Sequence, residues 1–200
     1  MRPRFAILIS GRGSNMSALL AAREQIPAEF ALVVSDQGDA PGLLKAREQG
    51  IPVAVAEKEK GQTKAMHEAA LSHMLAEAGI THIALAGYMR LLSPSFLDRF
   101  DAVVNIHPSL LPAFPGLHTH ARALAAGAKV HGCTVHLVDA GMDTGQIIAQ
   151  AGLDVRLDET PDTLAARVLR LEHTLYPLAL TTYLNGKLTP PASQLNELGR

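Results

Sequence analysis

The residues Phe5-Ala6-Ile7-Leu8-Ile9-Ser10-Gly11-Arg12-Gly13-Ser14-Asn15 combine an apolar run, a glycine-rich loop and a polar helix start. Five consecutive apolar residues are typical of a strand that is covered on both faces, as strands of parallel sheets are. The glycines permit a tight turn, and a helix is expected over 15–22 with Ser14 or Asn15 as its cap. A strand that leads through a short loop into a helix indicates an α/β fold.

The same alternation continues as far as residue 107. Met66, Ala70 and Met74 recur every four residues, which predicts a helix over Gln62–Ala78. Further strands are expected at Phe30–Ser35, Ile51–Val55, Thr81–Ala86 and Ala102–His107, and further helices at Pro41–Gln49 and Ser93–Arg99. This succession predicts a mostly parallel, doubly wound sheet of the Rossmann-like type.

The pattern changes in the second half of the chain. Lys129–Val138 and Gln146–Asp154 are two strand-like segments joined by a glycine-rich turn, which indicates an antiparallel pair. A long C-terminal helix is expected over Thr160–Tyr183, and Pro177 should kink or break it. Residues 187–200 are polar and contain prolines, so we expect a loosely held tail.

The composition fits one globular domain. With 200 residues, of which 48% are hydrophobic and 18% charged, the chain can bury a core without cross-links. A formal net charge of −1 argues against nucleic-acid or membrane partners. The single cysteine fits a reducing compartment, and no apolar segment reaches the length of a membrane span. We therefore expect a cytoplasmic protein.

The loop from Ser10 to Asn15 has two interpretations. Backbone N–H groups at a helix start favour an anion, and Gly13, Ser14 and Asn15 would form a cradle for a phosphate monoester. A plain strand-to-helix turn explains the same residues equally well. Asp36 lies near the acidic position of a dinucleotide fingerprint, but Met16 stands where its third glycine belongs.

Asn105, His107 and Asp143 are the candidate catalytic residues. Asn105 and His107 end a predicted central strand and share one face, and ligands bind at that edge of open α/β sheets. An amide and an imidazolium can stabilise an oxyanion that forms during acyl transfer. A carboxylate beside the histidine would orient it. A strand-end histidine and a turn aspartate without catalytic roles remain the alternative, because spacing alone cannot bring Asp143 to His107.

A metal site is not expected. His118, His120, His131, His136 and Cys133 lie close in the sequence, but they form neither a paired Cys-x-x-Cys nor a His-Glu-x-x-His motif. We expect Cys133 to be buried in a strand.

The sequence Asn105–Pro112, with Pro115–His120, resembles the folate-dependent formyltransferases. The resemblance extends from Ile9–Asn15 through Leu85–Pro94 to Leu171–His173, and so covers nearly the whole chain. It implies transfer of a formyl group from 10-formyltetrahydrofolate to the amine of 5′-phosphoribosylglycinamide, a step of purine synthesis. It further implies a single domain over 1–200, with a phosphate-binding half at 1–100, a catalytic and folate-binding half at 101–186, and a monomer or homodimer.

The resemblance also implies roles for single residues. Asn105 and His107 would stabilise the oxyanion, while Asp143 would pair with His107 and help the proton leave the amine. The substrate phosphate would lie at Gly13, Ser14 and Asn15, and the ribose hydroxyls at Glu172. Folate would be bound by Lys64, Met89, Arg90, Leu91, Leu92, Asn105, Asp139, Ala140, Gly141, Met142 and Asp143. Ala140 stands where relatives often carry an acidic residue, and Lys64 stands for a basic residue that is often arginine.

Three other functions compete with this one. Methionyl-tRNA formyltransferase shares the Asn–His–Asp set but carries a further C-terminal domain for tRNA, whereas this chain ends at Arg200 and has no basic patch. Formyltetrahydrofolate deformylase is a hydrolase with the same set and normally has an extra N-terminal domain, for which a fold expected to begin at Arg4 leaves no room. From a different class, a nucleotide-binding oxidoreductase or a binding module would use only the first glycine loop.

Overall fold

The computed structural model describes residues 2–186. The chain divides into two compact units, and the boundary in the sequence lies between Asn105 and Ile106. The predicted tail at 187–200 lies outside the described residues.

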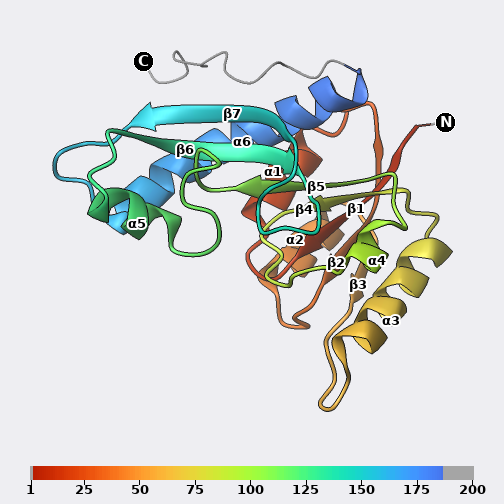
Figure 1. Cartoon of the computed structure of the whole chain (residues 1–200). Helices are drawn as coiled ribbons and strands as arrows, with labels where there is room; N and C mark the ends of the chain where they lie inside the picture. The colour runs from red at the N-terminus through yellow and green to blue at the C-terminus, as the bar shows by residue number, and fades with distance from the viewer. Residues whose placement is uncertain (1, 187–200) are drawn as a thin grey trace. The chain divides into compact units, whose positions relative to one another are not determined.

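The first unit is built on parallel strands (Figure 1). Each strand pairs in parallel with its neighbours in the order β3-β2-β1-β4-β5. The strands are β1 (Arg4–Ile9), β2 (Glu29–Ser35), β3 (Val53–Val55), β4 (His82–Leu85) and β5 (Ala102–His107). Residues 5–9 of β1 have no exposed surface, as their apolar run predicts. In the pairing of β4 with β5, Leu85 lies opposite Asn105.

Four helices connect these strands: α1 (Ser14–Ala21), α2 (Pro41–Glu48), α3 (Lys64–Glu77) and α4 (Pro94–Leu97). Ser93 caps α4 as predicted, because its side chain accepts a hydrogen bond from the backbone N–H of Phe96. The predicted cap of α1 is wrong. Gly13 is the N-cap, with a left-handed φ of 65°, and no side chain caps the helix. A glycine adopts this conformation at little cost, so the turn depends on its backbone and not on a Ser or Asn side chain.

The second unit contains an antiparallel pair, β6 (Val130–Leu137) and β7 (Ile147–Asp154). The long helix α6 (Pro161–Leu184) packs along both strands, as Figure 1 shows. A short helix, α5 (Thr119–Ala125), precedes β6 and was not predicted. It begins after His118, whose φ of 58° turns the chain into the helix.

Helix α6 continues through Pro177, so the predicted break does not occur. The proline removes one backbone hydrogen bond, but buried Leu175, Tyr176 and Ala179 hold this part of the helix in the core. One turn later, the Thr181 hydroxyl donates to the carbonyl of Pro177 at 2.9 Å. Tertiary packing therefore outweighs the local cost of the proline.

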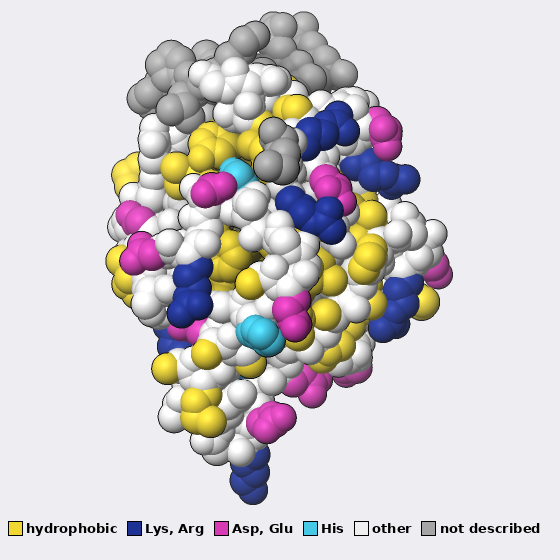
Figure 2. Space-filling view, turned by 90° about the vertical axis from the view of Figure 1, so that its right-hand side faces the viewer, with side chains coloured by type: hydrophobic (Ala, Val, Ile, Leu, Met, Phe, Trp, Pro, Cys, Tyr) yellow, Lys and Arg dark blue, Asp and Glu magenta, His cyan; other side chains and the backbone are white. Residues whose placement is uncertain are grey.

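Charges of both signs are interspersed on the face drawn in Figure 2. Among residues 2–186, no helix combines the length and apolarity that crossing a lipid bilayer needs. Within the same residues, no three His, Cys, Asp or Glu side chains are grouped as metal ligands would be.

Candidate active site

Strand β5 carries the first two candidate catalytic residues. Its sequence is apolar up to Val104, and the strand ends at His107, whose side chain is buried with a residue exposure of 6%. Asn105 precedes it by two residues on the same strand and is partly exposed. Alternation along a strand places both side chains on the same face.

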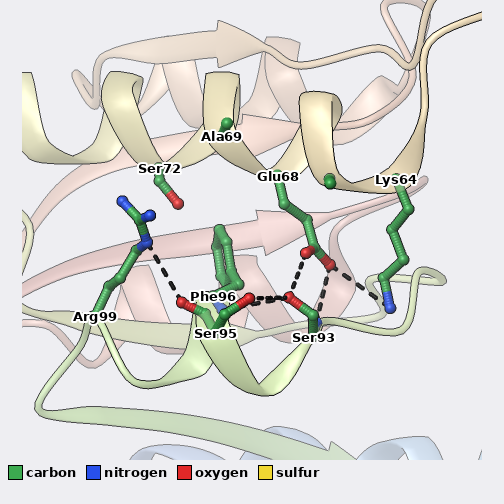
Figure 3. Close-up of a pocket in the computed structure, with 9 residues that line it drawn as sticks. Lys64, Glu68, Ala69, Ser72, Ser93, Ser95, Phe96 and Arg99 are labelled. Carbon is green, nitrogen blue, oxygen red and sulfur yellow. Dashed lines mark hydrogen bonds and ion pairs between the residues drawn. The ribbon is translucent and has the colours of Figure 1, made fainter.

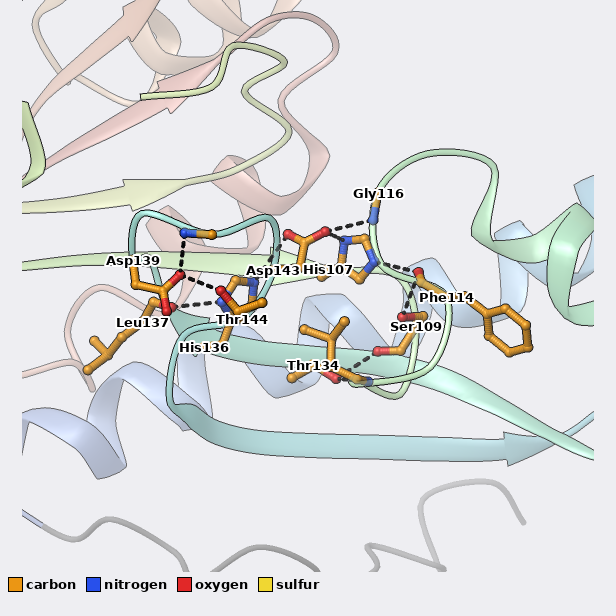
Figure 4. Close-up of polar contacts among 12 residues, drawn as sticks. His107, Ser109, Phe114, Gly116, Thr134, His136, Leu137, Asp139, Asp143 and Thr144 are labelled. Atoms are coloured by element: carbon orange, nitrogen blue, oxygen red, sulfur yellow. Dashed lines mark hydrogen bonds and ion pairs between the residues drawn. The ribbon is translucent and has the colours of Figure 1, made fainter. Parts of the chain in front are cut away.

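The His107 ring lies between two hydrogen-bond acceptors (Figure 4). Its Nδ1 atom is 3.4 Å from Oδ2 of Asp143, and its Nε2 atom is 3.1 Å from the backbone carbonyl of Phe114. Carboxylate and carbonyl oxygens only accept, so a ring nitrogen that carries a proton can donate to the oxygen it faces. The structure thus brings two of the three predicted catalytic residues together.

The Asp143 carboxylate is fixed from several sides. Gly116 donates its backbone N–H to Oδ2 at 2.8 Å, and Nε2 of His136 lies 3.7 Å from Oδ1. His136 is 2% exposed, and burial lowers the pKa of its imidazole, partly offset by a hydrogen bond to the Leu137 carbonyl and by the Asp143 charge. Asp143 also has a φ of 55°, which aspartate tolerates better than most residues. The carboxylate is therefore held in one orientation toward His107.

Hydrogen bonds hold the loop over residues 109–116, here the Ser109 loop, in place within the second unit. The hydroxyl of Ser109 donates to the carbonyls of Ala113 and Phe114 at 2.6 and 3.3 Å. Thr134, on β6, donates to the Ser109 carbonyl at 2.7 Å and accepts from the Leu111 N–H at 3.0 Å. These bonds, drawn in part in Figure 4, place the Phe114 carbonyl against His107.

The turn between β6 and β7 holds the predicted folate loop, Asp139–Asp143. Oδ1 of Asp139 accepts from the Gly141 N–H at 3.0 Å and from the Thr144 hydroxyl at 2.7 Å. Met142 is 53% exposed. Ala140 and Gly141 are exposed as well, so this loop offers a ligand the Met142 side chain and the backbone of Ala140 and Gly141.

The predicted phosphate cradle lies in the first unit, at the start of α1. Gly13 caps the helix, and Ser14 and Asn15 are its first residues, so the backbone N–H groups of its first turn are not used inside the helix. Helix α2 supports the loop, since Gly42 donates its N–H to the Gly11 carbonyl at 3.1 Å and Lys45 donates to the Arg12 carbonyl at 2.9 Å. The geometry fits an anion at this helix end.

Of the other predicted folate residues of the first unit, Met89 to Leu92 lie between β4 and α4, and Lys64 begins α3. Met89 and Leu91 are 70% and 66% exposed, and Arg90 is bonded through Nε to Asp36 at 2.7 Å. Lys64, the first residue of α3, has its ammonium 3.7 Å from Oε1 of Glu68. Leu92 follows them directly before the cap of α4.

Glu172, the predicted ribose ligand, lies on α6 in the second unit. It is 7% exposed. Burial raises the pKa of the Cys133 thiol, and the charge of Glu172 raises it further, which places this carboxylate near β6. Cys133 is buried, as predicted.

Residues 3–180 match the family of formyl transferases. The chain belongs to the formyl transferase family. The resemblance found in the sequence is thereby confirmed.

Among known sequences, this formyl transferase is 43% identical over 190 residues to the trifunctional purine biosynthetic protein adenosine-3 of Drosophila melanogaster. That match covers 92% of this chain but 14% of the other protein, so the chain spans about a seventh of that relative's length. It is 36% identical to phosphoribosylglycinamide formyltransferase of Haemophilus influenzae, over 97% of this chain and 99% of that one.

Solved structures give the same fold. Glycinamide ribonucleotide transformylase 1 from Symbiobacterium toebii has a TM-score of 0.90 and 41% identity, and the match covers 96% of this chain and 92% of that one. Phosphoribosylglycinamide formyltransferase from Brucella melitensis has a TM-score of 0.87 and 50% identity, covering 92% and 96%. The predicted fold class, a mostly parallel sheet with antiparallel C-terminal strands and a long C-terminal helix, is confirmed.

Several residues of this formyl transferase site escaped the sequence analysis. His136 was weighed only as a metal ligand, and Thr134 and Ser109 were not considered as supports of the catalytic loop. Asp36 was considered only as a dinucleotide ligand, whereas its carboxylate binds Arg90. One signal in the sequence could have indicated these supporting residues. Thr134 and His136 stand among apolar residues of β6, and buried polar groups need hydrogen-bond partners.

Proposed function

We propose that this formyl transferase moves the formyl group of 10-formyltetrahydrofolate to the amine of 5′-phosphoribosylglycinamide, in the cytoplasm and without a metal. The observation that carries the proposal is the contact of the buried His107 ring with Asp143. His107 ends β5, two residues after Asn105. Full-length similarity to phosphoribosylglycinamide formyltransferases supports the choice of acceptor.

The chemistry follows from the charges that develop. The amine lone pair attacks the formyl carbon, and the carbonyl electrons move to oxygen, giving a tetrahedral oxyanion. The Asn105 amide and a ring N–H of His107 stabilise this oxyanion. Asp143 orients His107, and it accepts the proton of the attacking amine through a water molecule. When the oxyanion collapses, the bond to N10 of the folate breaks and N10 takes up a proton.

The same proposal assigns the binding residues. The phosphate lies at Gly13, Ser14 and Asn15, where the backbone N–H groups at the start of α1 meet its charge. Glu172 accepts hydrogen bonds from the ribose hydroxyls. Folate contacts Lys64, the residues from Met89 to Leu92, Asn105 and the backbone of the Asp139–Asp143 loop.

The contact of His107 with Phe114 adds one step. Nε2 faces the Phe114 carbonyl in the described state. Before this N–H can reach a substrate oxygen, the Ser109 loop has to withdraw that carbonyl. The carbonyl thus keeps the ring oriented until the formyl group replaces it.

The deciding experiment is a spectrophotometric assay of folate release from a 10-formyl folate. It is run with phosphoribosylglycinamide, and separately without any acceptor. We expect release only when the acceptor is present. His107→Ala should lower kcat by about 10²–10³-fold, the usual effect of losing one oxyanion donor.

The other outcomes separate the competing functions. Release without the acceptor would identify a deformylase-like hydrolase. No release in either reaction, together with binding of a nicotinamide dinucleotide, would favour the oxidoreductase.

A further inference from the structure

We propose that Asp36 and Glu68 are positioning residues that hold the folate-binding segment of residues 87–93 in its binding conformation. This inference rests on the proposed function, because it takes folate as the ligand of that segment. Both carboxylates lie in the first unit and outside the segment itself, Asp36 directly after β2 and Glu68 on α3.

Asp36 holds the middle of the segment. It directly follows β2, is 3% exposed, and accepts a hydrogen bond from Nε of Arg90 at 2.7 Å. Its other oxygen, Oδ1, is buried and has no hydrogen-bond partner within residues 2–186. Because a buried charge needs compensation, this carboxylate restricts Arg90 to one position.

Arg90 is the cation that faces the Asp36 carboxylate, through Nε at 2.7 Å. Burial and the Asp36 charge raise the pKa of the neighbouring Tyr88 to about 12. The Arg90 side chain keeps 33% exposure, so the remaining guanidinium donors can still reach a ligand.

Glu68 holds the end of the segment, as Figure 3 shows. It extends from α3, is 7% exposed, and accepts both the backbone N–H of Ser93, at 2.9 Å, and the Ser93 hydroxyl. Ser93 in turn caps α4, so one carboxylate fixes the point where the segment enters that helix. Lys64 lies 3.7 Å from the same carboxylate.

The backbone of the segment is also tied to the first glycine loop. The N–H of Met89 donates to the Ser10 hydroxyl at 2.9 Å, and the Ser10 N–H donates to the Gly87 carbonyl at 3.1 Å. The backbone is thus anchored while Met89 and Leu91 expose most of their apolar surface. Large apolar side chains exposed on an anchored backbone suit a flat, partly apolar ligand, because little backbone ordering remains to oppose binding.

The test compares two matched carboxylate variants by steady-state kinetics on the full chain. Asp36→Asn keeps an oxygen acceptor but removes the charge, and we expect KM for 10-formyltetrahydrofolate to rise about tenfold. KM for phosphoribosylglycinamide and kcat at saturating folate should change less than about twofold. Glu29→Gln is the control, because Glu29 begins the strand that Asp36 follows, and its carboxylate also pairs with an arginine, Arg4.

A double-mutant cycle separates positioning from direct contact. If Asp36 acts through Arg90, Asp36→Asn should have no further effect on the folate KM in an Arg90→Gln background. Effects that multiply would mean that Asp36 contacts the ligand itself, and would overturn the inference. Should Asp36→Asn not fold, the Glu68→Gln variant keeps the inference falsifiable, because Glu68 holds the other end of the same segment.

Glu68 is tested with Glu68→Gln, because Glu68→Ala would enlarge the cavity of about 410 Å³ that Glu68 lines between α3 and α4 (Figure 3). The amide can accept only one of the two Ser93 donors, so the folate KM should again rise selectively. The inference would be overturned if the variants turned over normally with an unchanged folate KM, or if the KM values of both substrates rose equally. Either result would leave the proposed function intact. A wild-type chain without formyl transfer would overturn the proposed function as well.

Discussion

At the scale of single residues, the orientation of His107 depends on the Asp143 charge. The carboxylate lies 3.4 Å from Nδ1, and Asp143→Asn keeps its size but removes its charge. We expect kcat to fall by about 10²–10⁴-fold, the range for a lost acid–base group, with little change in KM for the phosphorylated substrate. Asp101→Asn is the matched control, because Asp101 also faces a histidine, His82, at 3.9 Å. A kcat equal to wild type in the Asp143 variant would remove this residue from the mechanism.

The sequence predicted this residue pair only in part. Asn105 and His107 could be placed at a strand end because the residues before them are apolar. Side chains alternate between the two faces of a strand, so these two residues share one face. The approach of Asp143 could not be predicted from spacing, since the chain between them passes through a helix and a strand. The contact of the Phe114 carbonyl with His107 could not be predicted either. A backbone carbonyl is present in every residue, so the sequence does not indicate which one accepts the hydrogen bond.

At the scale of elements, His120 of α5 and His131 of β6 form a link that is sensitive to acid. Nδ1 of His120 lies 3.1 Å from Nε2 of His131, so one of these nitrogens has to be unprotonated for the hydrogen bond to exist. Burial, and then the charge of His120, lower the pKa of His131 from 6.5 to about 4. The unfolded chain therefore binds the proton first as the pH falls.

The sign of the pH effect follows directly. The stability contributed by neutral His131 is complete above pH 6.5 and is lost as the pH falls from 6.5 to about 4. We expect His131→Gln to make the free energy of unfolding less dependent on pH in this window, by at most about 1.4 kcal/mol per pH unit. Urea titrations at a series of pH values measure this slope. Equal slopes in both proteins would show that His131 titrates alike when folded and unfolded.

Most elements were predictable, because apolar periodicity reports burial directly. The helix predicted at Gln62–Ala78 is observed at Lys64–Glu77, and β5 has its predicted bounds. Helix α5 was missed because its seven residues are too few for a periodic pattern. The break predicted at Pro177 is wrong, although the local rule that proline disfavours a helix interior was clear. The packing of the buried side chains of α6 outweighs that rule.

At the scale of the whole molecule, the boundary between the two compact units falls inside a strand. Strand β5 runs from Ala102 to His107, and the units divide after Asn105. Independent domains are normally joined by an exposed linker with few contacts. Unfolding either unit here would require part of the same strand to unfold, so we expect the prediction of one domain to hold.

Differential scanning calorimetry tests this prediction. One transition is expected, with equal calorimetric and van't Hoff enthalpies and a total near 60 °C of about 140 kcal/mol. Thr134→Val perturbs only the second unit, where it removes the buried partner of Ser109 and Leu111. Losing these bonds costs about 1–3 kcal/mol, and for one cooperative domain the whole transition should move down by several degrees. If the units unfold independently, the variant will instead split the trace, and only the fraction of the enthalpy that belongs to the second unit will shift.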